Sequence, residues 1–185
     1  KDYMKVPLDY NRMEEETLDT MWDTITKNKA PFKKYFERKA QLFGVDQLGW
    51  LDVSASVDVG DYKNKQYTYN EAAEFIIDNF ESFSPKMSEM ARRAFEEQWI
   101  EAEDRPGKRP GGYCSNLPES KQSRIFMTFA GSTSNVSTLA HELGHAFHSY
   151  VLRDLPLFNQ RYAMNVAETA STFAELVVSN ATIEN

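Results

Sequence analysis

The pattern of apolar and polar positions in the first part of the chain is that of amphipathic helices. Over about 11–29, apolar residues recur at spacings of three and four, which places them on one helical face. A second helix is predicted from Pro31 to Phe43, because proline suits a first helical turn and Gly44 stands where such a helix would end. We therefore expect two consecutive helices at the start of the chain.

The next segments predict a loop followed by two more helices. Residues 51–69 read as extended or looped, and Asn70 could cap the helix that follows. Ser84 and Pro85 form a cap and first turn for another helix, which we expect to run to about Ile100.

The last third changes character before it returns to helices. Residues 103–118 are punctuated by Pro and Gly and predict a loop, either a connector or a segment that contacts substrate. Arg124 to Phe129 is rich in β-favouring residues and predicts a short strand. Two helices joined by a linker that contains Pro156 complete the chain. The expected fold class is mainly α, with a small β element in front of the first of these two helices.

Composition and charge exclude some classes of function. The chain has 185 residues, is 41% hydrophobic and carries a net charge of -7 without a basic block, so we expect no nucleic-acid partner. No apolar run reaches the roughly 20 residues that cross a bilayer, and we expect no membrane association. The single cysteine, Cys114, and the lack of a signal peptide favour a cytoplasmic location. The chain starts at Lys1 and stops at Asn185 after a helical stretch, so we expect it to be part of a longer protein.

The most informative motif is the run from His141 to His145, which matches H-E-x-x-H. Residues four apart lie roughly 40° apart on a helix, so both imidazoles can reach one Zn²⁺ ion. Glu142 lies one step round the helix, where it can act as general base on a water without binding the metal. All three histidines of the chain fall within eight residues, at 141, 145 and 148, which disfavours a chance match.

The sequence around the motif predicts the helix that it needs. An apolar stripe with helical spacing runs from Val136 to Tyr150 on nearly the opposite side from the two histidines. Ser134, Asn135 or Ser137 could cap the start of this helix.

The last predicted helix offers the third ligand of the zinc ion. Glu168 and Glu175 are seven residues apart and share one face, while Val166, Ala170, Phe173 and Val177 would form the apolar one. We expect Glu168 to bind the metal. Glu175 either accepts a hydrogen bond from a ligating imidazole or is an exposed carboxylate. His148 is expected to contact a metal-binding residue or the substrate rather than the metal, since a further ligand would close the site.

The two terminal helices resemble the oligoendopeptidase F branch of the thimet-oligopeptidase-like metallopeptidases. The resemblance rests on the runs 138–149 and 167–175, and extends through the Pro106–Gly112 loop and Arg124–Phe129 to most of residues 70–180. It implies one Zn²⁺ per chain on His141, His145 and Glu168, with Glu142 as the base, in a helical zincin-type core that hydrolyses oligopeptides. All 185 residues would then belong to one catalytic domain, divided into helices (1–100), loop and short strands (101–135) and zinc-binding helices (136–185).

The resemblance also implies how substrate binds and what this chain lacks. In that family, the strand before the zinc helix, here 126–131 with Phe129 and Gly131, pairs with the peptide backbone. The tyrosine and histidine side chains that stabilise the oxyanion in that family lie further along than Asn185, so the alternative is a zinc-binding fragment with little or no activity. Two alternatives from other functional classes remain: a domain whose zinc is structural, without catalysis, and a helical interaction module.

Overall fold

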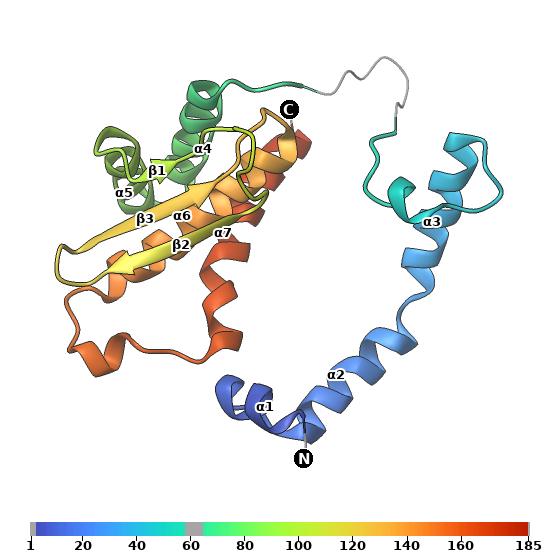
Figure 1. The fold of residues 1–185 in the computed structure, drawn as a ribbon, viewed down its shortest axis with the longest axis horizontal. Coiled ribbons are helices and arrows are strands. Elements are labelled where there is room, and N and C mark those ends of the chain that lie inside the picture. The colour runs from blue at the N-terminus through green and yellow to red at the C-terminus, as the bar shows by residue number, and fades with distance from the viewer. Residues whose placement is uncertain (1–2, 58–64, 185) are drawn as a thin grey trace. The chain divides into compact units, whose positions relative to one another are not determined.

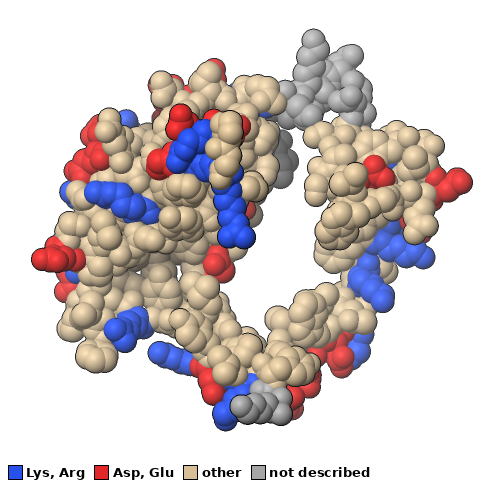
Figure 2. Space-filling model, in the orientation of Figure 1, with Lys and Arg blue, Asp and Glu red and all other residues tan. Residues whose placement is uncertain are grey.

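The computed structural model describes residues 3–57 and 65–184. Its contacts divide the chain into two compact units, residues 1–63 and residues 64–185 (Figure 1). Positive and negative side chains are interspersed over each unit on the face drawn in Figure 2. The expectation that the whole chain belongs to one catalytic domain stays a prediction.

The first unit consists of helices α1 (Lys5–Asn11), α2 (Glu15–Lys27) and α3 (Ala30–Phe43) and a 3₁₀ turn (Trp50–Asp52). The helix predicted over about 11–29 is confirmed as α2, but it begins at Glu15, because Arg12 takes a left-handed conformation with a φ of 51°. The short helix α1 before it was not predicted. The predicted second helix is confirmed as α3, which Gly44 ends with a φ of 70°. The predicted loop over residues 51–69 lies partly outside the described residues.

The second unit begins with helices α4 (Tyr69–Phe83) and α5 (Pro85–Glu96). Thr68, not Asn70, caps α4, because its hydroxyl accepts from the Glu71 N–H while the Glu71 carboxylate accepts from the Thr68 N–H. Helix α5 ends four residues short of the predicted Ile100, since Gln98 has a φ of 55°. That turn leads the chain into the sheet.

The sheet has the order β1-β3-β2, with β1 (Ile100–Glu101) parallel and β2 (Gly112–Leu117) antiparallel to β3 (Gln122–Met127). The predicted strand is confirmed as β3, two residues earlier than expected. The prediction of a loop through residue 118 was wrong at β2. The residues of β2 are mostly exposed and show no apolar pattern. The strand forms because it pairs with β3, for example Cys114 with Ile125.

Helices α6 (Thr133–Leu152) and α7 (Met164–Glu184) follow, joined by a linker with a 3₁₀ turn at Leu157–Gln160. The sheet lies across α6 (Figure 1). One core joins both helices to the sheet, α4 and α5; it includes the fully buried side chains Phe80, Met87, Ile125, Met127, Leu139 and Leu143. The expected fold class, mainly α with a small β element before the H-E-x-x-H helix, is confirmed. Within residues 3–57 and 65–184, no helix is long and apolar enough to cross a bilayer.

Candidate metal centre

Helix α6 presents the two motif histidines opposite the core, as the sequence predicts. Val136 and Leu139 are buried, whereas the His141 and His145 side chains keep 24% and 19% of their surface exposed. The predicted cap was wrong. Ser132 caps the helix, and its hydroxyl accepts a 3.2 Å hydrogen bond from the N–H of Asn135.

Gly144, between the two histidines, lets α7 approach α6 directly. A Cβ atom at this position would lie 2.7 Å from the Ala170 carbonyl oxygen and 2.7 Å from the Cα of Ser171. The close approach turns one face of α7, with Ser171 and Ala174 at its centre, into the core. The predicted apolar face was therefore wrong, since Val166 and Phe173 are 44% and 39% exposed. The face that packs on α6 is the one that carries Glu168 and Glu175.

This packing brings three metal-binding atoms together. The Nε2 atoms of His141 and His145 lie 3.2 Å apart, and Oε2 of Glu168 lies 3.2 Å and 3.4 Å from them. Tetrahedral ligands at the usual 2.0–2.1 Å from Zn²⁺ are about 3.3 Å from one another. The three atoms therefore have the separations that one zinc ion requires.

The His141 imidazole is held by a bond from its other nitrogen. Nδ1 of His141 lies 2.5 Å from Oε1 of Glu175, and the Ser137 hydroxyl donates to the second oxygen of Glu175 at 3.0 Å. Burial lowers the pKa of His145, which favours its neutral form. With its Nδ1 bonded to Glu175, the His141 ring directs its Nε2 lone pair at the shared position.

Glu142 is a buried carboxylate beside this position. It is 4% exposed, and its Oε2 has no hydrogen-bond partner among the residues that the structure describes. Burial raises the pKa of Glu142 to about 7; the charges of Glu168 and Glu175 also raise it, and His141 opposes them. Strand β2 passes close by, since a Cβ atom on Gly112 would lie 2.8 Å from Oε1 of Glu142.

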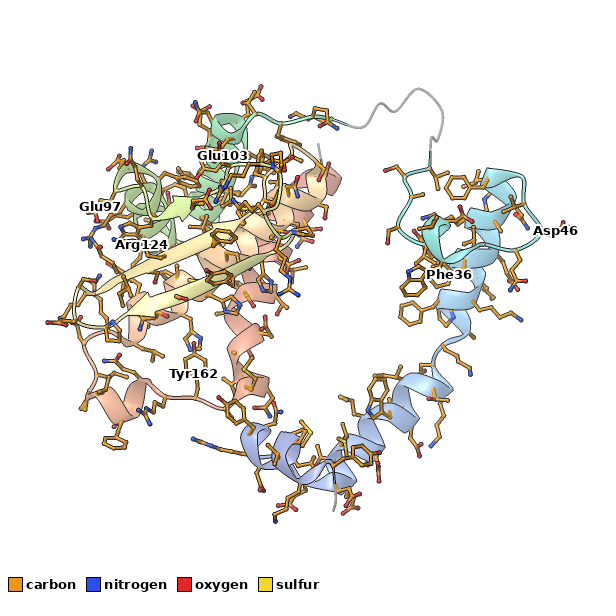
Figure 3. The ribbon with its side chains drawn as sticks, viewed as in Figure 1. Phe36, Asp46, Glu97, Glu103, Arg124 and Tyr162 are labelled. Atoms are coloured by element: carbon orange, nitrogen blue, oxygen red, sulfur yellow. The ribbon has the colours of Figure 1, made fainter. Side chains whose placement is uncertain are left out.

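His148 lies one turn beyond His145 and contacts a residue that the sequence did not single out. Its ring stacks on Tyr162, with 4.4 Å between ring centroids and 18° between ring planes. Tyr162 comes from the linker before α7 (Figure 3). No periodicity in the sequence pointed to this aromatic residue, because the linker that carries it is irregular.

The segment 126–131 is already paired within the chain. The N–H of Phe129 donates to the Ala102 carbonyl at 3.0 Å, and the Gly131 carbonyl accepts from the N–H of Tyr67 at 2.9 Å. Strand β3 is also flanked by β1 and β2. These bonds occupy the Phe129 N–H and the Gly131 carbonyl, and β2 lies at the edge of the sheet. The pairing of 126–131 with a peptide stays a prediction.

The family model and the relatives that match this chain all describe peptidases. The model of Peptidase family M3 matches residues 1–185. Oligopeptidase PepF of Bacillus subtilis is 26% identical over 188 residues, which cover 100% of this chain and 27% of that protein. Group B oligopeptidase PepB of Streptococcus agalactiae is 28% identical over 173 residues, which cover 93% of this chain and 28% of that protein.

Solved structures agree with the sequence comparisons. Pz peptidase A, solved with an inhibitor, superposes on this chain with a TM-score of 0.80 at 26% sequence identity. The superposition covers 91% of this chain and 30% of the Pz peptidase A chain. The chain thus spans less than a third of the length of the relatives that it matches. Since the family model covers every residue, the chain belongs to peptidase family M3.

Proposed function

We propose that this chain forms the zinc site of a peptidase that hydrolyses oligopeptides. His141, His145 and Glu168 would hold one Zn²⁺, and Glu142 would act as the general base. The observation that carries the proposal is the triangle formed by Nε2 of His141, Nε2 of His145 and Oε2 of Glu168, 3.2–3.4 Å on each side, with the His141 ring held through its other nitrogen.

The donor set fits a catalytic rather than a structural zinc site. Three protein ligands leave one coordination position open, whereas structural sites use four. A zinc ion held here supplies two effects, a lowered pKa of coordinated water and a polarised peptide carbonyl. A structural site would also have no use for a buried carboxylate between its histidines.

Glu142 has the position and the proton affinity for acid–base work. Its buried Oε2 is free of partners in the described part of the chain, so it can accept a proton from water. A pKa raised toward neutrality lets the same carboxyl group pass that proton to the leaving amine.

The substrate class comes from the relatives and from the free edge of β2. The relatives are named oligopeptidases, PepF and PepB. In an antiparallel pair, alternate residues point their N–H and C=O groups away from the partner strand. The Gly111 carbonyl accepts from Thr128, so Gly112 and Cys114 are the residues that point outward. An extended peptide added to this edge would pass beside Glu142.

Peptide hydrolysis by the zinc-loaded chain tests this proposal against its alternative. We expect cleavage of a fluorogenic oligopeptide by the wild-type chain and at least a 100-fold loss in Glu142→Gln, with zinc retained, because general acid–base catalysis contributes about 10²–10⁴-fold. Glu96→Gln, an exposed glutamate on α5, is the matched control. Turnover unchanged in Glu142→Gln would remove this residue from the reaction. A zinc-loaded wild type without turnover would support the alternative of a zinc-binding fragment that is inactive by itself.

A further inference from the structure

The linker between α6 and α7 is largely exposed, although it sets where Glu168 lies. Leu157 is 60% exposed and Phe158 83% exposed, so these side chains give the linker little to pack against. Ala163, at its end, is buried. The path of the linker must therefore be held near that end.

The first turn of α7 is also held weakly by the core. Residues Ser171, Ala174 and Val178, which are buried against α6 and its neighbours, all follow Glu168 in the sequence. On the other side of Glu168, Met164 is 53% exposed. The packing that fixes α7 thus lies on one side of the proposed ligand only.

The stack of His148 and Tyr162 supplies a contact on the other side. His148 follows His145 by three residues on α6, and Tyr162 precedes Glu168 by six. The rings are nearly parallel, with a centroid separation of 4.4 Å. Nδ1 of His148 is buried without a hydrogen-bond partner in the part of the chain that the structure describes, so the contact is made by the face of the ring.

Tyr162 stands two residues before the start of α7 and is 38% exposed. Burial raises the pKa of Tyr162, and the charges of Cys114 and Glu168 add to this effect. The phenol therefore stays neutral near neutral pH, and the ring packs as an uncharged aromatic group. Tyr162 thus contacts helix α6 through His148 and adjoins the start of α7 in the sequence, and these two helices carry the proposed ligands.

We propose that Tyr162 is a positioning residue for the metal centre: its ring, stacked on His148, holds the start of α7 so that Glu168 meets the histidine pair. This inference rests on the proposed function, because it assigns Tyr162 a role through the ligand Glu168.

Zinc affinity of the whole chain, measured by competition with a chromogenic chelator, tests the role of Tyr162. We expect Tyr162→Ala to weaken zinc binding about 10-fold or more, the usual effect of losing a group that orients a ligand. Tyr162→Phe keeps the ring and should bind within about 2-fold of wild type. Phe158→Ala, which removes an exposed ring from the same linker, should leave the affinity unchanged. Equal affinities of Tyr162→Ala and wild type would overturn the proposal, and so would a Tyr162→Phe variant as weak as Tyr162→Ala.

A double-mutant cycle with His148→Ala separates the stack from a general loss of folding. If the two rings act through each other, the double variant should bind zinc about as weakly as either single variant. Independent, additive losses would contradict the stack as the cause. Circular dichroism identifies any variant that fails to fold.

Amide hydrogen exchange of the metal-free chain keeps the proposal testable without zinc. We expect faster exchange at residues 163–168 in Tyr162→Ala than in wild type, and protection restored in Tyr162→Phe. Unchanged exchange would overturn the proposal. If the wild-type chain binds no zinc, the proposed function fails, and the exchange experiment still decides the role of the stack.

Discussion

The two units of this chain are stabilised differently. In the first unit, only Lys39 and Ala40 of the described residues are buried, while Trp50 and Leu51 are 89% and 88% exposed. In the second unit, side chains from α4, α5, the sheet, α6 and α7 form one core around residues such as Phe80. The helices of the first unit therefore bury few side chains, whereas the metal centre depends on the packing of the second unit.

The largest expected difference between the units comes from deleting one ring in each. Phe80→Ala removes a fully buried ring and should lower the free energy of unfolding by about 3–5 kcal/mol. Phe32→Ala removes a ring that is 64% exposed and should cost less than about 0.5 kcal/mol. Urea unfolding followed by circular dichroism measures both. Similar costs would contradict the contrast between a packed and an unpacked unit.

A smaller loss is expected from the closest helix contact of the second unit. Gly144→Ala places a methyl group against the α7 backbone, so it should lower the free energy of unfolding by about 1–3 kcal/mol. It should also weaken zinc binding, because it moves Glu168 away from the histidines. Gly49→Ala in the first unit, where the nearest atom is a side-chain oxygen at 3.3 Å, is the control. A Gly144→Ala chain with unchanged stability and zinc affinity would show that the helices do not need this approach.

The buried Glu142 predicts a pH dependence of the metal-free chain. Its pKa is raised to about 7 in the folded state from 4.5, so its contribution to stability is full below pH 4.5 and is lost as the pH rises through 7. Glu142→Gln cannot ionise and should lose less stability between pH 5 and pH 8, by about 1–2 kcal/mol. Thermal melting at several pH values, with Glu96→Gln as control, measures this difference. Parallel curves for Glu142→Gln and wild type would contradict the raised pKa.

The smallest effect concerns helix caps. Thr68→Ala removes the capping hydroxyl of α4 and should cost about 1 kcal/mol. Glu14 stands at the same position of α2 in the first unit but makes no side-chain cap bond, so Glu14→Ala should change stability by less than about 0.5 kcal/mol. Equal effects on the urea midpoint would mean that capping does not distinguish the two helices.

Much of the candidate site could be predicted from the sequence because its signals are local. The i, i+4 spacing of His141 and His145 needs only a helix, and the sequence around the motif predicts that helix. The seven-residue spacing of Glu168 and Glu175 likewise places both carboxylates on one face of α7. The structure then brings that face to the histidines.

The rest depended on contacts between distant segments. Strand β2 forms by pairing with β3, and its mostly exposed residues carry no apolar pattern that could reveal it. The buried face of α7 carries Ala174 and Val178 and lies against Gly144 of α6, whereas the larger apolar residues Val166 and Phe173 are exposed. Tyr162 reaches His148 through an irregular linker, so no periodicity relates the two.

Zinc content of the purified chain after dialysis, measured beside His141→Ala, tests the central claim most directly. The three converging atoms predict about one zinc ion per wild-type chain, and its loss in His141→Ala, because two protein ligands hold zinc poorly. A wild-type chain without zinc, or a His141→Ala chain that retains it, would contradict the proposed metal centre.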